Sequence, residues 1–228
     1  MRAIYFPFLK ENASKNILVS DEAVKHLHVV RIKSEDEILV LNGKGLKALT
    51  RVGLISKNQI ELLVNSIEES VATHQISLAI ATPKKDAFED ILKIAVELGV
   101  RDIYPLNSEF SQYEYLVSDR VQRILESALI QSNNPFLPII HPQIELNIFL
   151  DKLNTPLYFF NSRPLDSGKD EKISGEKTIL IGPEGGFSHV EEANILKKNN
   201  VFSIHLPTPI LRAPTAVASS IGYLLSPR

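Results

Sequence analysis

The pattern of hydrophobic and polar positions changes character near residue 72. In the preceding part, short runs rich in Leu, Ile and Val alternate with polar turns, a pattern typical of β-strands. Ser20 stands where a side chain can cap a short helix, and the two glycines of segment 42–45 favour a tight reversal between strands. Several short strands with one helix predict a small β-barrel. The expected elements are strands over 16–19, 37–41 and 59–64 and a helix over 21–30.

From residue 75 the pattern becomes an alternation of continuous apolar runs and amphipathic stretches. This alternation predicts an α/β domain with a parallel sheet covered by helices on both faces. Two segments, Asp86–Glu89 and Ser188–Glu191, have the residue spacing of a capping box, and Gly99 supplies a left-handed helix stop. The expected strands are 76–81, 100–105, 157–160, 178–181 and 201–206; the expected helices are 86–98, 118–131, 188–198 and 214–225, and a polar loop covers 166–177.

Composition narrows the class of protein. The chain has 228 residues, is 44% hydrophobic and 23% charged, and carries a formal charge of -2, which favours a globular protein without a dispersed basic coat. It has no cysteine, so disulfides, thiolate catalysis and cysteine-based zinc cages are excluded. The six histidines are scattered, and neither a signal peptide nor an apolar run of membrane-spanning length is evident. We therefore expect a soluble cytoplasmic protein with no metal and no membrane partner.

The most informative segment is 181–188, Ile-Gly-Pro-Glu-Gly-Gly-Phe-Ser, between an expected strand and a capped helix. Its glycines let the backbone turn sharply and approach a ligand closely, and ligands of parallel sheets bind at the carboxyl ends of the strands. A merely tight turn is the alternative, but such a turn seldom needs three glycines and a proline. A phosphate cradle is less favoured, because the Lys-Ser/Thr ending of a nucleoside-triphosphate loop is missing and Glu184 would repel a phosphate.

A second segment, 206–216, also follows an expected strand and opens a helix. Its prolines stiffen the loop and leave Ile210 and Leu211 as an apolar wall. Arg212 can form hydrogen bonds through its planar guanidinium, although a surface ion pair is an equally good interpretation of this residue alone.

Together and in this order, the two segments resemble the knotted SPOUT class of RNA methyltransferases. Within that class, the chain is similar to the family of 16S ribosomal RNA (uracil-N3)-methyltransferases. Segment 181–188 matches the Gly-Pro-Glu-Gly-Gly signature of this family, and Leu211-Arg212 with Thr215-Ala216 matches part of its Leu-Arg-Thr-Glu-Thr-Ala signature. Weaker matches are Lys93 with 97–100 and the segment His26–Arg31.

The resemblance implies a PUA-like β-barrel over 1–70 that binds RNA, followed by a SPOUT domain over 74–228 tied in a trefoil knot. It implies a homodimer that uses S-adenosyl-L-methionine to methylate N3 of a uridine in small-subunit (16S) ribosomal RNA. The RNA substrate, in the small ribosomal subunit, would be the partner, and no metal would take part.

Site residues are expected on this basis. Arg212 is hypothesised to be catalytic because of its place beside the expected adenine wall, polarising a uracil carbonyl and stabilising negative charge on the base. Arg2 and Arg31 are expected to contact RNA, Arg31 through the resemblance. The expected cofactor contacts are Asn161, Ile181, Gly182, Glu184, Gly185, Gly186, Leu206, Ile210, Leu211 and Ala216.

The chain departs from the family pattern at several positions. Phe110, Asn134 and Pro209 stand where members usually have arginine, Pro207 stands where glycine is usual, and Ala213 and Pro214 replace a Thr and a Glu of the last signature. The lost arginines remove possible RNA contacts. Two alternatives therefore stay open: a non-catalytic RNA-binding or ribosome assembly protein that retains the cofactor pocket, and a phosphate-binding metabolic α/β enzyme.

Overall fold

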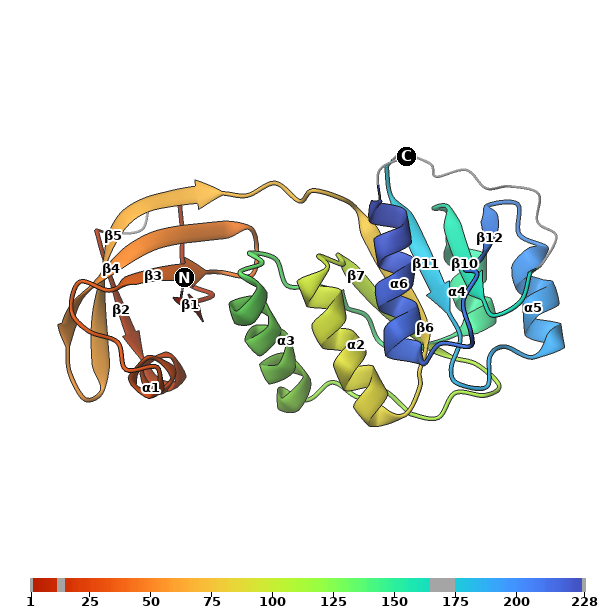
Figure 1. The fold of residues 1–228 in the computed structure, drawn as a ribbon, viewed down its shortest axis with the longest axis horizontal. Helices are drawn as coiled ribbons and strands as arrows, with labels where there is room; N and C mark the ends of the chain where they lie inside the picture. Colours follow the sequence, from red (N-terminus) through yellow and green to blue (C-terminus); the bar gives the residue numbers. More distant parts are fainter. Residues whose placement is uncertain (1, 12–14, 165–174, 227–228) are drawn as a thin grey trace. The chain divides into compact units, whose positions relative to one another are not determined.

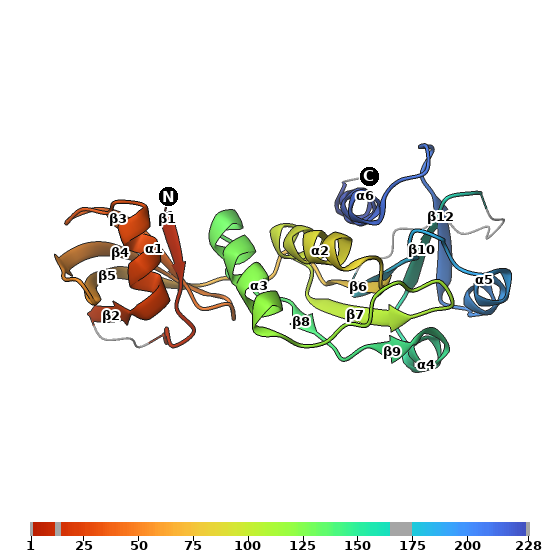
Figure 2. The same ribbon diagram turned by 90° about the horizontal axis from the view of Figure 1, so that it is seen from below.

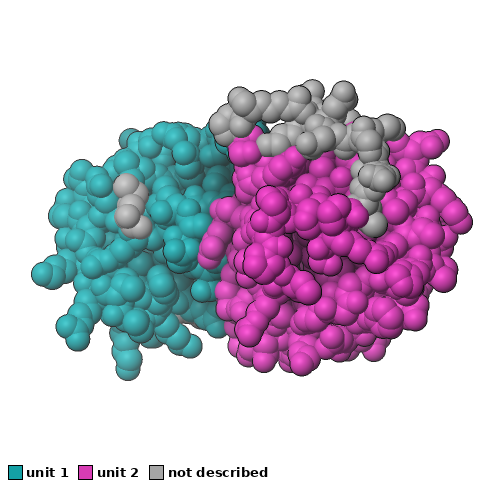
Figure 3. Space-filling view, turned by 45° about the vertical axis from the view of Figure 1, so that its right-hand side comes forward, with its two compact units in different colours: residues 1–73, 125–137 teal, residues 74–124, 138–228 magenta. Residues whose placement is uncertain are grey.

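The computed structural model describes residues 2–11, 15–164 and 175–226. The chain forms two compact units: unit 1 consists of residues 1–73 and 125–137, and unit 2 of residues 74–124 and 138–228 (Figure 3). Helix α3, Asp119–Ser132, therefore contributes residues to both. Most of the loop expected over 166–177 lies outside the described residues.

Unit 1 is built on a five-stranded sheet with the order β1-β3-β4-β5-β2. The first pair in this order is parallel, the others are antiparallel, and the long strands β4 and β5 curve along their length (Figure 1). Two register shifts between them interrupt the ladder, and such bulges bend a strand. The elements are β1 Arg2–Tyr5, β2 Asn16–Ser20, α1 Asp21–Val29, β3 Glu37–Leu41, β4 Leu46–Ile55 and β5 Gln59–Glu69.

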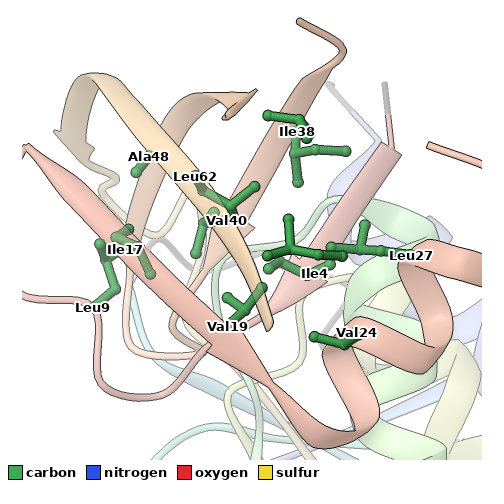
Figure 4. Packing of buried hydrophobic residues seen from close by; sticks show 12 residues of the cluster. Ile4, Leu9, Ile17, Val19, Val24, Leu27, Ile38, Val40, Ala48 and Leu62 are labelled. Carbon is green, nitrogen blue, oxygen red and sulfur yellow. The ribbon is translucent and has the colours of Figure 1, made fainter. Parts of the chain in front are cut away.

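The core of unit 1 is formed by alternate residues of its strands, together with one side of α1. Because successive strand residues point to opposite faces, Ile17 and Val19 are buried whereas Leu18, between them, is 61% exposed. Helix α1 contributes Val24 and Leu27, which lie among the buried strand side chains in Figure 4. The predicted small β-barrel is thus a curved sheet whose inner face holds one apolar cluster.

The glycine-rich turn predicted between β3 and β4 is confirmed, and it also forms hydrogen bonds to a distant segment of the chain. Gly43 and Gly45 have φ values of 75° and 106°, which residues with a side chain rarely adopt. The Gly45 amide donates to the Pro135 carbonyl (2.9 Å), and the Leu137 amide donates to the Gly43 carbonyl (2.9 Å). These bonds join the end of segment 125–137 to unit 1, which no local sequence pattern indicates.

Unit 2 is an α/β fold around a parallel sheet with the order β12-β10-β11-β6-β7, in which β8 and β9 both pair with β7. Helices α2 and α6 cover one face and α4 and α5 the other (Figure 2), so the predicted two-sided cover is confirmed. The elements are β6 Ile76–Ala81, α2 Lys85–Glu97, β7 Asp102–Asn107, β8 Ile139–Ile140, β9 Ile144–Glu145, α4 Leu146–Lys152, β10 Leu157–Asn161, β11 Lys177–Ile181, α5 His189–Leu196, β12 Val201–His205 and α6 Ala213–Leu225.

One of the two predicted capping boxes is confirmed. The hydroxyl of Ser188 accepts a hydrogen bond from the Glu191 amide (3.4 Å), and the Glu191 carboxylate accepts one from the Ser188 amide (2.9 Å). Helix α5 therefore begins directly after Ser188, as the spacing predicts.

The capping box predicted at Asp86–Glu89 is wrong. Helix α2 begins at Lys85, and its N-cap residue makes no side-chain cap. The Glu89 carboxylate instead accepts two hydrogen bonds of 2.6 Å from the Arg120 guanidinium, which hold the pKa of Glu89 below its ordinary value. The ion pair with Arg120 therefore engages the carboxylate that the spacing had assigned to the cap.

His74 makes the stability of the protein depend on pH. Its Nε2 donates to the Leu98 carbonyl (3.0 Å), and its Nδ1 is buried with no partner among the described residues. Burial lowers the pKa of His74 below the ordinary 6.5. The unfolded chain therefore takes up a proton below that pH before the folded one does, so stability falls as the pH drops from 6.5 toward the lowered value.

We expect His74→Gln to remove this part of the pH dependence, because glutamine keeps a donor for the Leu98 carbonyl but does not titrate. Urea unfolding above and below the ordinary histidine pKa measures it. The free energy of unfolding should fall less on acidification in the variant than in the unaltered protein. An identical fall in both proteins would contradict the assignment.

Candidate active site

A cavity opens at the carboxyl ends of three adjacent strands, β12, β10 and β11. Each strand sends one loop into its wall, at residues 161–162, 182–187 and 206–211, and helix α6 forms a further side. Because these loops are far apart in the sequence, the cavity exists only when the sheet is assembled. Its position agrees with the rule that ligands of open parallel sheets bind at the carboxyl ends.

The glycine loop after β11 is shaped by close backbone approach. The Gly186 amide donates to the Pro183 carbonyl (2.9 Å), and Gly186 has a φ of 72°. A Cβ atom on Gly182 would lie 3.3 Å from the Gly186 backbone and from the Phe187 ring. The φ of Gly186 therefore favours glycine, and a side chain at Gly182 would crowd the loop; Pro183, Glu184 and Phe187 of the same loop also line the cavity.

The loop after β7 contacts the glycine loop and the start of α5. The Glu109 amide donates to Oε1 of Glu191 (2.8 Å), the carboxylate that also caps α5. Phe110, 42% exposed, lies against Gly185, where an added Cβ would come within 3.3 Å of the Phe110 Cβ. The sequence indicated Glu191 only as a cap, so this second contact was missed.

The third loop and α6 form an apolar side of the cavity. Leu206 and Leu211 are half-buried, whereas Ile210 is 86% exposed. Behind them, α6 presents small residues, Ala213 and Ala216, which leave room for a flat ligand. No Lys or Arg is among the described residues that line the cavity, whereas two glutamates, Glu184 and Glu192, do line it.

One polar atom in this lining has no protein partner. Ser220 of α6 is fully buried and lines the cavity, and its hydroxyl has no hydrogen-bond partner among the described residues. A serine in a helix leaves no signal in the sequence, so this residue was not predicted.

The loop after β10 is fixed by its own hydrogen bonds. The Asn161 side-chain amide donates to the Ser203 hydroxyl (2.9 Å), and its oxygen accepts from the Arg163 amide (3.1 Å). Arg163 in turn pairs with Glu192 of α5. Asn161 thus orders this wall of the cavity through its side chain.

Comparison with known proteins gives the family. Residues 70–225 match the model of an RNA methyltransferase domain, and residues 19–65 match that of an RNA methyltransferase PUA domain. The chain is 30% identical to "Ribosomal RNA small subunit methyltransferase E" of Rickettsia conorii, over 95% of this chain and 91% of that protein. It is 29% identical to the protein of the same name from Aquifex aeolicus, over 96% of this chain and 98% of that one. The chain belongs to this methyltransferase E family.

The solved structures agree with the family. The chain is similar to the ribosomal RNA small subunit methyltransferase E of Neisseria gonorrhoeae in its complex with S-adenosyl methionine, with a TM-score of 0.84 and 27% identity over 98% of this chain and 96% of that one. The resemblance found in the sequence and the expected fold, a PUA-like domain followed by an α/β methyltransferase domain, are confirmed. The trefoil knot stays a prediction.

The cofactor contacts expected from the family signatures come together. All of them line the cavity except Gly185, which packs against Phe110 on the other side of the glycine loop. Lining residues that the sequence did not indicate include Phe159, Phe160, Thr208, Glu192 and Ser220. Their roles toward a ligand stay predictions.

The three expected arginines lie outside the cavity lining. Arg212 is the N-cap residue of α6, between two lining residues; it is exposed and forms no ion pair within the described part of the chain. Arg2 pairs with Asp36 (2.8 Å) in unit 1. Arg31, also in unit 1, is exposed and has a φ of 53° just after α1.

The described residues show neither a metal centre nor a membrane-spanning helix. In residues 2–11, 15–164 and 175–226, no group of three or more His, Asp or Glu side chains is arranged to hold a metal ion. Within the same ranges, no helix has the length and apolar character needed to cross a lipid bilayer.

Proposed function

We propose that this protein transfers a methyl group from S-adenosyl-L-methionine to N3 of a uridine in 16S ribosomal RNA, acting in the cytoplasm on the small ribosomal subunit. Residues 1–70 would bind RNA, and residues 74–228 would form the knotted catalytic domain of a homodimer that needs no metal. The observation that carries the proposal is the cavity walled by three loops at the carboxyl ends of β10, β11 and β12. Membership of the family and the Neisseria complex with S-adenosyl methionine support it.

The cavity suits this cofactor better than a phosphate ligand. Glycine-loop residues and apolar side chains line it, Glu184 adds an exposed carboxylate, Glu192 is paired with Arg163, and no Lys or Arg is among its described lining residues. These features favour a cationic sulfonium and oppose a phosphate. When bound, S-adenosyl-L-methionine supplies an activated methyl group.

The protein must then overcome the low nucleophilicity of uridine N3, which carries a proton at neutral pH. The stiff loop 206–211 would hold the base in line with the reacting methyl group, and orientation of this kind contributes up to about 7–11 kcal/mol in ideal cases. Arg212 follows that loop and has a guanidinium without an ion pair in the described residues. It would donate hydrogen bonds to a uracil carbonyl and stabilise the negative charge that develops on the base as N3 gives up its proton to solvent.

Transfer of tritium from labelled S-adenosyl-L-methionine to small ribosomal subunits tests the activity, and mass spectrometry of ribosomal RNA from cells with and without the protein identifies the nucleotide. Binding of S-adenosylhomocysteine without transfer would favour the non-catalytic assembly protein. Preference for nucleotides in a thermal-shift panel would favour the metabolic enzyme. Light scattering of the purified protein tests the dimer.

RNA binding by unit 1 is tested through its salt dependence. Each phosphate contact contributes about 0.7–0.9 to the slope of log affinity against log salt, so Arg31→Ala is expected to lower that slope by about 1. Arg2→Ala should lower it less, because Arg2 already pairs with Asp36. Arg51→Ala, which removes a surface pair with Glu35, is the matched control in the same unit. An unchanged slope in Arg31→Ala would remove this residue from the RNA interface.

A further inference from the structure

Phe110 places a partly exposed aromatic ring beside the glycine loop. It follows β7, and 42% of its surface is open to solvent. Its inner side packs against Gly185, and the next residue of the glycine loop, Gly186, lines the cavity. The ring therefore stands one backbone segment away from the cavity, with its outer part free to meet a partner.

The loop that carries Phe110 is also fixed on the side of β6. The buried Thr82, directly after β6, accepts a hydrogen bond from the Gln112 amide at its carbonyl (2.9 Å) and donates its hydroxyl to the Tyr113 carbonyl. The Gln143 side chain donates to the same hydroxyl (3.1 Å). A ring on a loop whose backbone is already ordered loses little conformational entropy when it binds a partner.

Two exposed lysines, Lys84 and Lys85, follow this anchor at the start of α2. Neither forms an ion pair within the described part of the chain, and Lys85 acts on the Glu89 carboxylate only through space, because Arg120 binds both oxygens of that group. A cation at the start of a helix is disfavoured by the helix dipole, whereas Asp86 in the same turn is favoured. The helix dipole thus does not explain the lysines, and their ammonium groups are available to an anion.

The carboxylates near the ring indicate which part of an RNA it meets. Glu109 precedes Phe110, Glu184 precedes Gly185, and both glutamates are exposed. Carboxylates repel a phosphate but not a neutral base, so a base fits the ring and a phosphate fits the lysines. Aromatic rings that stack on bases, next to cations that contact the backbone, are typical of proteins that hold single-stranded nucleic acid.

We propose that Phe110, Lys84 and Lys85 bind the RNA beside the target uridine, the ring stacking on a flanking base and the lysines contacting phosphates. The inference rests on the proposed function, because it takes RNA as the substrate, and it adds an RNA site in unit 2 to the contacts expected in unit 1. Only the glycine loop separates the ring from the cavity, so the stacked base would hold the uridine at the cavity mouth.

The ring is tested by binding to small ribosomal subunits from cells without the protein, measured at several salt concentrations. Phe110→Ala is expected to weaken binding at least about 5-fold without changing the salt slope, because stacking carries no charge. Phe110→Tyr keeps the ring and should bind like the unaltered protein. Leu196→Ala, which removes a side chain of similar exposure (38%) at the end of α5, is the control.

Binding of S-adenosylhomocysteine distinguishes stacking from support of the glycine loop. Phe110 does not line the cavity, so Phe110→Ala should bind this ligand normally in calorimetry. A loss of S-adenosylhomocysteine affinity as large as the loss for the ribosomal subunit would show that the ring only supports the loop, and it would overturn the stacking.

The lysines are tested through the salt slope itself. The double variant Lys84→Ala, Lys85→Ala should lower the slope of log affinity against log salt by about 1.4, since each contact to a single strand contributes about 0.7. Lys152→Ala with Lys197→Ala is the matched control: it removes the same charge from the ends of α4 and α5, where the helix dipole favours lysine, and should leave the slope unchanged.

An unchanged slope in the Lys84, Lys85 variant, or an equal decrease in the control, would overturn the inference. The proposed function would still stand if the unaltered protein methylates the subunits. Failure of the unaltered protein to bind or methylate them would overturn both.

Discussion

Replacing Arg212 by alanine is expected to slow methyl transfer in a single turnover by about 100-fold or more, the typical effect of removing one donor that stabilises a developing charge. Arg212 occupies the N-cap position of α6 beside the cavity without a side-chain cap, and it has no carboxylate partner among the described residues, so its guanidinium is available to a substrate carbonyl. Binding of S-adenosylhomocysteine should not change, because Arg212 does not line the cavity. Rapid-quench measurement of methylated RNA with enzyme in excess tests this directly.

Two variants make the result specific. Arg212→Lys keeps the charge but loses the planar pair of donors, so it should recover only part of the rate. Arg101→Ala removes an exposed arginine that pairs with Glu176 near the start of β7, and it should leave the rate unaltered. An Arg212→Ala enzyme with full single-turnover rate would show that another group stabilises the base.

The second large effect is expected at Gly182. A Cβ there would lie 3.3 Å from backbone atoms of Gly186 and from the Phe187 ring, and the branched side chain of valine would add further atoms to this contact. Backbone yields less easily than a side-chain end, so the glycine loop must open. Overpacking of about 1–3 kcal/mol, acting on the loop that lines the cavity, should weaken S-adenosylhomocysteine binding about 10- to 100-fold.

Gly222→Ala is the matched control for this substitution. Gly222 lies in α6, nothing stands within 4 Å of its Cβ position, and a glycine in a helix interior is less stable than alanine. This variant should bind S-adenosylhomocysteine normally and melt at a slightly higher temperature. Calorimetric titration and thermal unfolding of both variants separate loss of the pocket from loss of the fold. Normal binding by Gly182→Val would show that the loop adapts without opening.

The sequence predicted well those features whose physical cause is local. Ser188 and Glu191 satisfy each other's backbone within one helical turn, and Gly99 ends its helix through its own φ of 70°, so the residues that make both features are neighbours in the sequence. Asp86–Glu89 has the same spacing, but Arg120, from another helix, binds Glu89 and overrides the local pattern. Spacing alone does not distinguish these two cases.

Other features were missed for a different reason. The strands β8 and β9 and the helix α4 are too short for a clear hydrophobic period. The two backbone hydrogen bonds that join Pro135 and Leu137 to the turn of Gly43 and Gly45 leave no pattern, because every residue has a backbone acceptor and every residue except proline a backbone donor. The glycine signature indicated the wall of the cavity, but Ser220 became visible only once burial and the hydrogen-bond partners were known.

The carboxylate of Glu191 joins two loops through their main chains. One oxygen receives the amide of Ser188 and the other the amide of Glu109, at 2.9 Å and 2.8 Å. Release of one bond weakens the hold on the other, since both depend on the same side-chain rotamer. The first turn of α5 and the turn after β7 are therefore expected to open together. Hydrogen exchange of the Ser188 and Glu109 amides should then be coupled.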